Sequence, residues 1–319
     1  MPPAKAHKTR AKAITKTKAK RPHIFIQAND KQYVGAIVSA YSMKHNSAHG
    51  ADFDVTIMRK EDHACFDNHE GKPYRRHGVD RIWKNNDLQS FTPTRFLPPQ
   101  LMGYEGRALV VDPDVFAVGD VWELLTRDMD GKAIMCRGSH FKNGAWATSV
   151  MLLDCAKLKH WDMDKSFNEL FSGKRDYHNW MSLLMEDQST IGMFENEWND
   201  FDKLTPATKM VHNTRRRTQP WKTGLPVDYT PTEFVPILGW FMRMRRKFFG
   251  EHGLLGSYSR HPDRNQEALF FGMLKGALKA GMVNDKALRE AMAKNYIRHD
   301  AIDMIAKTPE WTTGKLAAA

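Results

Sequence analysis

An Asp-x-Asp pair stands where a buried strand is expected to end. Asp112 and Asp114 directly follow the apolar run 108–111 and precede residues 120–123, which have the spacing of a helix N-cap and capping box. Two carboxylates one residue apart at a strand end can bind a divalent cation, and hard oxygen ligands suit Mg²⁺ or Mn²⁺. Such a cation can bridge a diphosphate and neutralise its charge as it leaves. The alternative is a turn in which the carboxylates accept local N–H groups.

Position distinguishes this pair from the other Asp-x-Asp patterns of the chain. The same pattern begins at Asp52, Asp128, Asp162 and Asp200. Only the copy beginning at Asp112 follows an apolar strand pattern and precedes a capped helix. We therefore interpret Asp112 and Asp114 as the candidate cation-binding pair.

The elements that would position the pair alternate between strands and helices. Apolar runs predict strands at 23–28, 53–58, 108–111, 133–136 and 150–153, and apolar residues at helical spacing predict a helix over 33–43. This alternation indicates an α/β fold with a mixed, mostly parallel sheet flanked by helices, whose ligands bind beyond the carboxyl ends of the strands. Asp30 and Asp112 both stand at such ends.

The composition changes near residue 223. Glycine and three prolines punctuate residues 224–236, residues 240–249 are basic and aromatic, and 264–306 has helical patterning. We expect one domain over 23–223, followed by a loop and helical C-terminal extension over 224–319 that can pack on the same domain.

The net charge of +11 is concentrated at the N-terminus. Residues 1–22 hold 8 of the 48 Lys and Arg residues and no acidic residue, which leaves 40 basic against 37 acidic side chains over 23–319. A nearly neutral remainder does not favour nucleic acid as a partner. The segment 1–22 has too few apolar residues to fold and is predicted to be a disordered basic tail.

Hydropathy and cysteine content predict a cytoplasmic protein. The chain lacks the uninterrupted apolar stretch of a membrane-spanning helix and the apolar core of a secretory signal. Its three cysteines, Cys65, Cys136 and Cys155, are far apart and fit neither a disulfide framework nor a zinc site.

Residues 23–222 resemble, in order, the family 8 glycosyltransferases, the group that includes glycogenin and the bacterial lipopolysaccharide galactosyl- and glucosyltransferases. The segments that carry the resemblance are 28–33, 94–96, 108–125, 146–154 with 186–188, and 211–221. The segment 108–125, which contains the Asp-x-Asp pair, is the most specific match. The resemblance implies a GT-A-type, Rossmann-like fold.

The resemblance also implies roles for individual residues. Donor binding is implied for Ala28, Asn29, Asp30, Gln32, Tyr33, Arg95, Asp112, Pro113, Asp114, Arg215, Gln219 and Lys222. His212 is implied as the third metal ligand, and a nitrogen ligand beside two carboxylates favours Mn²⁺ somewhat over Mg²⁺. Asp187 and Gln188 are implied near the transferred sugar, as the catalytic pair.

The chain departs from the family pattern at four positions. Ala147 and Ser149 replace an Asn and a Gly, which leaves donor choice open, while Arg215 replaces a Gly and Gln219 replaces a phosphate-binding Lys. The missing charge can come from Arg215, Arg216, Arg217 or Lys222. Taken singly, His212 can be a structural histidine, Asp187 a helix cap, and Arg95 the partner of a surface carboxylate.

The segment 240–249 has two interpretations. As a helix it mixes aromatic residues with cations, a composition suited to an anionic membrane surface, and some bacterial relatives end in a membrane-associating tail of this kind. Aromatic residues at helical spacing also line cores. Peripheral contact with the inner face of the membrane and simple core packing both remain open.

The sequence therefore predicts a metal-dependent retaining glycosyltransferase. It would move a hexose from a nucleotide diphosphate sugar, UDP-glucose or UDP-galactose, to a hydroxyl of a glycan or lipid-linked glycan. The alternative is an adaptor on the same fold that has lost catalysis and binds nucleic acid or anionic membrane through its basic tail.

Overall fold

The computed structural model describes residues 20–138, 144–229, 236–250 and 252–312. Its main sheet has six strands in the order β2-β1-β5-β8-β7-β9. The strands are β1 (His23–Ala28), β2 (Asp54–Arg59), β5 (Arg107–Val111), β7 (Ile134–Gly138), β8 (Trp146–Asp154) and β9 (Ile191–Met193). β1 pairs in parallel with β2 and β5, and β7 pairs in parallel with β9, whereas β8 is antiparallel to both of its neighbours. The predicted mixed, mostly parallel sheet is confirmed.

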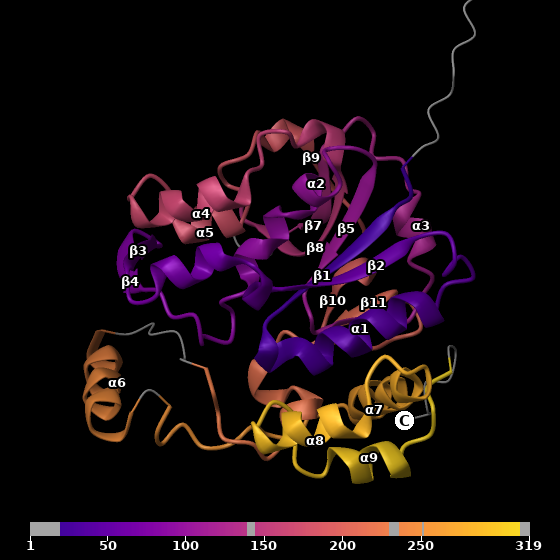
Figure 1. Ribbon diagram of the computed structural model, residues 1–319, viewed down its shortest axis with the longest axis vertical. Coiled ribbons are helices and arrows are strands. Elements are labelled where there is room, and N and C mark those ends of the chain that lie inside the picture. The colour runs from indigo at the N-terminus through magenta and orange to yellow at the C-terminus, as the bar shows by residue number, and fades with distance from the viewer. Residues whose placement is uncertain (1–19, 139–143, 230–235, 251, 313–319) are drawn as a thin grey trace, which may run out of the picture.

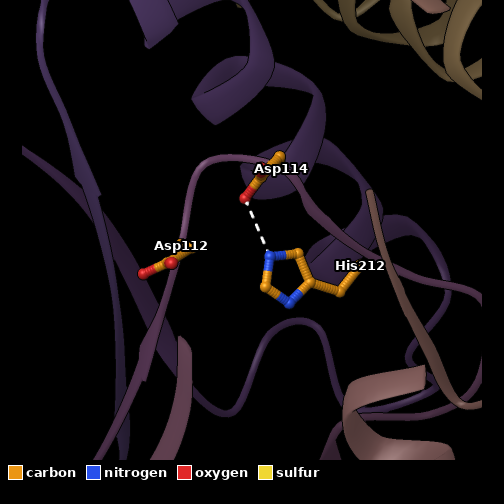
Figure 2. A group of neighbouring side chains, drawn as sticks. All are labelled: Asp112, Asp114 and His212. Carbon is orange, nitrogen blue, oxygen red and sulfur yellow. Dashed lines mark ion pairs between the residues drawn. The ribbon is translucent and has the colours of Figure 1, made fainter. Parts of the chain in front are cut away.

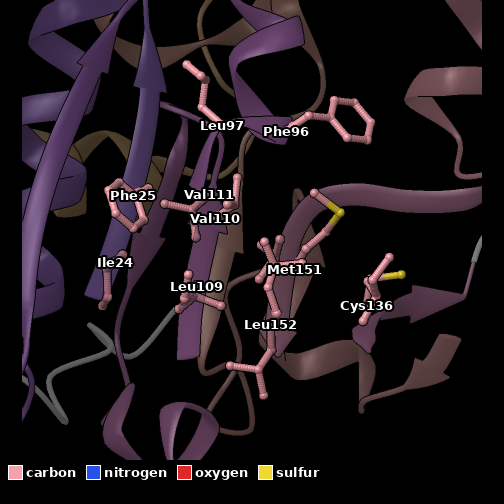
Figure 3. Packing of buried hydrophobic residues seen from close by; sticks show 14 of the residues in the cluster. Ile24, Phe25, Phe96, Leu97, Leu109, Val110, Val111, Cys136, Met151 and Leu152 are labelled. Atoms are coloured by element: carbon pink, nitrogen blue, oxygen red, sulfur yellow. The ribbon is translucent and has the colours of Figure 1, made fainter. Parts of the chain in front are cut away.

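The central strands are apolar along their length because both faces of the sheet are covered. Ile24 and Phe25 of β1 and Leu109 and Val110 of β5 are all buried, and they pack with residues of β7 and β8 (Figure 3). A continuous apolar run is the expected pattern for a strand without a solvent face. This packing fixes the carboxyl ends of β1 and β5 at the same edge of the sheet.

Helix α1 (Tyr33–His45) connects β1 to its parallel neighbour β2. A crossover helix of this kind is the usual way to join adjacent parallel strands. Ten of its residues, 34–43, are buried because one side faces the sheet and the other faces α7 (Arg264–Lys279). Gly276 of α7 permits this approach, since a Cβ there would lie 2.2 Å from the Tyr41 hydroxyl oxygen.

A second, three-stranded sheet stands beyond the end of β5. Its order is β10 (Asp200–Phe201), β11 (Met210–His212) and β6 (Val115–Ala117), and β11 runs antiparallel to β6 with His212 opposite Val115. Residues 112–114 form the turn after β5. The chain then continues as β6, which pairs directly with β11. This small sheet brings two distant parts of the sequence to one place.

Short elements and a hairpin cover one end of the main sheet. The hairpin consists of β3 (Pro73–Arg76) and β4 (Val79–Ile82), and it lies against α4 (Met163–Phe171) and α5 (Tyr177–Met181) through a cluster of aromatic rings. Helix α2 (Pro98–Leu101) precedes β5. Helix α3 (Trp122–Leu125) follows β6, and its N-cap is Val121. The predicted capping box that begins at Asp120 is wrong, because Asp120 accepts a 2.9 Å hydrogen bond from the Trp122 N–H while Glu123 pairs with Lys209.

The described residues of the C-terminal part form three helices beneath α1 and one that stands apart. Helices α7, α8 (Asp285–Ala293) and α9 (Ala301–Lys307) share an apolar cluster with α1, whereas α6 (Pro236–Phe249) projects at one side of the molecule (Figure 1). Among the described residues, no helix combines the length and apolar composition needed to cross a bilayer. Residues 1–19 of the predicted basic tail lie outside the described residues.

Candidate active site

Three side chains predicted as metal ligands converge at the carboxyl end of β5. Asp112 and Asp114 flank the turn between β5 and β6, and His212 reaches them from the end of β11 (Figure 2). One ligand atom from each of these residues lies within 4.8 Å of the other two. A pair of carboxylate oxygens and an imidazole nitrogen at this spacing fits a single Mn²⁺ or Mg²⁺ ion.

The pKa values of His212 and Asp112 are both shifted from their ordinary values. Burial favours the neutral ring of His212, but the charges of Asp114 and Asp112 outweigh it and raise the pKa of His212. Burial also raises the pKa of Asp112, and Asp114 adds to this shift while Arg95 opposes it. Both shifts follow from holding two carboxylates close together away from solvent.

Arg95 and Gln27 hold Asp112 in place. Arg95, in the 3₁₀ turn Thr92–Phe96, is buried and its Nη2 lies 3.1 Å from Asp112 Oδ1. The same guanidinium donates to Thr148, and Gln27 of β1 donates to Asp112. Arg95 therefore pairs with a carboxylate of the cluster itself. The alternative of a surface ion pair is wrong.

A cavity of about 180 Å³ opens beside the cluster. Its lining includes the three candidate ligands with Gln32, Phe91, Pro113, Arg216 and Gln219. Ligand pockets for whole drug-sized molecules usually span about 300–1,000 Å³. The cavity therefore has room for a cation with phosphate groups, but not for an entire nucleotide sugar.

Close packing of α1 supports the turn that carries Pro113. A Cβ at Gly35 would lie 2.8 Å from the Pro113 carbonyl oxygen, so a larger residue at 35 would displace this turn. The absence of a side chain at Gly35 thus lets the first turns of α1 approach the Asp-x-Asp segment directly.

Within the first predicted donor motif, residues 28–33, some side chains are buried and support the fold, while others are exposed. Ala28 and Asn29 are buried, and the Asn29 amide donates to the backbone oxygens of Asp87 and Leu88. Asp30 accepts a 2.5 Å hydrogen bond from Arg59. The same guanidinium lies 5.3 Å from the centre of the half-exposed Tyr33 ring.

Gln32 is the member of this motif that lines the cavity. Arg59 was missed by sequence reasoning because it is the last residue of β2 and has no motif of its own. Only the register that pairs it with Ala28 brings it beside Asp30.

The four cations proposed to replace the missing lysine have different surroundings. Lys222 is fully buried, and its Nζ lies 3.1 Å from Asp228 Oδ2. Burial lowers the pKa of Lys222, with Asp228 opposing the shift. Arg215 is mostly exposed and points to Asp202, and Arg217 does not line the cavity. Arg216 does line it, so among these four it is the cation placed to meet a phosphate.

Asp187 and Gln188 do not line this cavity. Asp187 caps the 3₁₀ turn Gln188–Thr190 by accepting from the Ser189 N–H at 2.9 Å, and it lines a separate cavity with Glu186 and His160. Gln188 donates to the Leu183 carbonyl and accepts from the Trp146 indole. Capping by Asp187 is the alternative role that its sequence context allowed.

Gln219 and Ser149, two of the departures from the family pattern, are linked by hydrogen bonds to the candidate metal ligands Asp114 and His212. Gln219 donates to Asp114 Oδ2 at 3.0 Å. Ser149 Oγ accepts from Asn199 at 2.9 Å, and Asn199 Oδ1 lies 3.0 Å from His212 Nδ1. Asn199 was not predicted, because it lies in a short 3₁₀ turn between strands that carries no motif.

Comparison with known proteins gives matches in structure but none in sequence. No protein-family model and no curated protein sequence matches the chain. Similar structures include the apo form of the glycosyltransferase GlyE from Streptococcus pneumoniae TIGR4, with 17% identity, a TM-score of 0.45, and coverage of 64% of this chain and 56% of that one.

Two further structures show similar values. The galactosyltransferase LgtC in complex with donor and acceptor sugar analogues has 12% identity, a TM-score of 0.44, and coverage of 63% of this chain and 89% of its own. Mouse xyloside xylosyltransferase 1 has 11% identity, a TM-score of 0.40, and coverage of 61% and 98%. Because all of these identities and TM-scores are low, we infer the function of the chain from its own site.

Proposed function

We propose that the protein is a metal-dependent retaining glycosyltransferase that moves a hexose from a UDP-linked donor to a hydroxyl of a glycan or lipid-linked glycan. The observation that carries the proposal is the convergence of Asp112, Asp114 and His212 beside a phosphate-sized cavity that Arg216 also lines. A cation held by these ligands and a guanidinium facing the same space are complementary to a diphosphate.

The chemistry requires charge stabilisation more than a strong base. Transfer breaks the bond between the anomeric carbon and a phosphate oxygen, forms a bond to the acceptor oxygen, and releases the hydroxyl proton. A bound Mn²⁺ or Mg²⁺ supplies charge neutralisation at the departing diphosphate. Arg216 donates to its oxygens, and Arg95 holds Asp112 so that the site is organised before the donor arrives.

The sugar and base ends of the donor would extend beyond the cavity. We place the base near Asp30 and Tyr33, where it would stack on or displace the Arg59 guanidinium. We place the transferred sugar toward Asp187 and Gln188. A structure with bound UDP-sugar tests both placements through contacts of these residues with the base and the sugar.

Donor hydrolysis is the test of the proposed activity. We expect release of UDP from a UDP-hexose in the presence of Mn²⁺, and loss of most of this activity in Asp112→Asn. Asp128→Asn is the matched control, because Asp128 belongs to another Asp-x-Asp and accepts from the Asp130 N–H in a loop. Equal UDP affinity in wild type and Asp112→Asn would instead favour the catalytically inactive adaptor.

We also propose that α6 contacts an anionic membrane surface. Its large apolar residues Trp240, Phe241 and Phe248 are 52%, 59% and 66% exposed. Trp240, Met244 and Phe248 recur every four residues, so they share one helix face. The helix contains four cations and no acidic residue, which complements anionic lipid headgroups. Core packing is therefore the wrong interpretation for these side chains.

Vesicle sedimentation tests this membrane contact. The triple variant Trp240→Ser, Phe241→Ser, Phe248→Ser should lose binding to vesicles that contain phosphatidylserine, while wild type binds them better than neutral vesicles. Val79→Ser with Ile82→Ser is the control, since these apolar residues are 56% and 55% exposed but belong to β4 and not to α6. Equal binding by the triple variant and wild type would contradict the proposal.

A further inference from the structure

Two of the four positions at which the chain departs from the family pattern, Ser149 and Gln219, are linked to the candidate metal ligands by hydrogen bonds. We propose that Gln219 and Asn199, the latter held by Ser149, are positioning residues that orient Asp114 and His212 for a divalent cation. The inference rests on the metal site of the proposed function, and it adds residues that do not touch the cation themselves.

Asn199 determines which nitrogen of His212 is free to bind. Its Oδ1 lies 3.0 Å from His212 Nδ1, and an amide oxygen can only accept, so Nδ1 carries the hydrogen. The lone pair of the neutral ring is then on Nε2, the atom that lies 3.3 Å from Asp114 Oδ1 within the cluster. Metal-bound histidines commonly donate their other N–H to such a partner.

Ser149 fixes the orientation of Asn199. Asn199 is fully buried, and its Nδ2 donates to Ser149 Oγ at 2.9 Å, which leaves its oxygen directed at the imidazole. A glycine at 149 has no hydroxyl, so it would leave this buried amide N–H without the acceptor it has here. The serine thus supports His212 through one intermediate side chain.

Gln219 performs the corresponding task for Asp114. Its side chain is 1% exposed, and Nε2 donates to Asp114 Oδ2 at 3.0 Å, so the carboxylate is held with Oδ1 facing His212. Its own Oε1 is buried without a hydrogen-bond partner among the described residues. A lysine at 219 would place a second positive charge against the carboxylate that must bind the cation.

This arrangement makes an unexpected prediction about the family residues. Ser149→Gly and Gln219→Lys restore the residues of the family pattern, yet both should weaken the binding of the metal alone. The supporting hydrogen bonds of metal ligands typically contribute roughly 10–100-fold to affinity. We therefore expect a loss of roughly this size in Asn199→Leu and Gln219→Met as well.

Electron paramagnetic resonance titration of the full chain with Mn²⁺, in the absence of nucleotide, measures this affinity directly. Asn213→Leu and Gln89→Met are matched controls. Asn213 is a buried amide next to His212 whose Nδ2 contacts Gln266, and Gln89 lines the same cavity without a described contact to the three ligands. Both controls should bind Mn²⁺ like wild type.

Conservative replacement separates positioning from folding. Asn199→Asp keeps an oxygen that accepts from His212 Nδ1 and should retain most of the affinity, unlike Asn199→Leu. Thermal unfolding of each metal-free variant shows whether it is folded. Ser149→Ala, which deletes only a hydroxyl, provides the test if Asn199→Leu does not fold, and we expect weaker Mn²⁺ binding there too.

The outcomes distinguish this inference from the proposed function. If Asn199→Leu, Ser149→Ala and Gln219→Met bind Mn²⁺ as wild type does while Asp112→Asn loses it, the positioning role is overturned and the metal site stands. If wild type itself binds no Mn²⁺ or Mg²⁺, both the metal site and the positioning role are overturned.

Discussion

His212 is both a candidate metal ligand and a base whose proton affinity the neighbouring carboxylates increase. Its pKa lies above the ordinary value of 6.5 because the charges of Asp114 and Asp112 outweigh burial. A cation needs the lone pair on Nε2, so protons compete with it. Mn²⁺ affinity should therefore rise with pH, continue to rise above 6.5, and level off only above the raised pKa of His212.

Mn²⁺ titrations at several pH values measure this dependence. His212→Gln is the control, because an amide has no proton to lose in this range and should bind weakly with a shallower pH dependence. An affinity that is already constant below pH 6.5 in wild type would contradict the raised pKa.

Two neighbouring arginines offer a second test at the scale of single residues. Arg216 lines the cavity, whereas Arg215 is largely exposed and pairs with Asp202. Arg216→Ala should weaken UDP binding in the presence of Mn²⁺ roughly tenfold or more, because a charge-assisted hydrogen bond contributes about 1.5–3 kcal/mol. Arg215→Ala should change it little. Calorimetry measures the UDP affinity of both variants. Equal losses of affinity in the two would refute the assignment of phosphate binding to Arg216.

Single residues were predictable where they belong to a motif, and not where a long-range contact defines them. Asp112 and Asp114 were identifiable because an apolar strand pattern precedes them and a helix-start pattern follows them in the sequence. Asn199 and Arg59 had no such local signal: each becomes important only through strand register or a contact with a residue far away in sequence. Likewise, Arg216 could be identified among the four candidate phosphate-binding cations only from the structure, in which it lines the cavity.

At the scale of elements, the contact between α1 and α7 depends on one glycine. A Cβ at Gly276 would lie 2.2 Å from the Tyr41 hydroxyl oxygen, so Gly276→Ala should lower the free energy of unfolding by about 1–3 kcal/mol through overpacking. The double variant with Tyr41→Leu should recover part of this loss. Urea unfolding of the two single variants and the double variant measures the coupling, and strictly additive losses would show that the two residues do not clash.

The longer elements could be predicted from periodicity, but the short ones could not. The apolar runs at 23–28 and 108–111 became β1 and β5, and the patterning over 33–43 became α1. The three-residue strands β6 and β11 carry too few residues for a period to be visible. Since these two strands bring His212 to Asp114, the position of the third ligand followed from resemblance and not from local pattern.

At the scale of the whole molecule, α6 belongs to a segment whose two ends meet. Pro226 and Ser257 form an antiparallel bridge, and the Val227 N–H donates to the Gly256 carbonyl at 3.0 Å. Residues at these joined ends also contact the candidate active site, because Asp228 pairs with Lys222 and the Arg216 guanidinium lies 5.6 Å from the centre of the Tyr229 ring. The two ends of the segment are thus held together by contacts that do not involve α6.

Replacement of residues 236–250 by a short Gly-Ser linker should therefore leave the fold intact. Segments whose ends are already close tolerate such changes well. We expect the replaced protein to unfold at a temperature close to that of wild type and to bind UDP with Mn²⁺ as wild type does. Circular dichroism and calorimetry measure these two properties, and a collapse of the fold would show that α6 stabilises the body of the molecule.

Because the ends of the segment meet without α6, removal of α6 would separate the proposed membrane attachment from the candidate active site. An enzyme held at a surface meets lipid-anchored acceptors in two dimensions, so their effective concentration rises without any new contact in the active site. The benefit disappears for acceptors that diffuse freely in solution. Loss of α6 should accordingly slow turnover of a vesicle-embedded acceptor while leaving turnover of its soluble analogue unchanged. The ratio of the two rates would then measure how much of the catalytic efficiency comes from encounter and how much from the site itself.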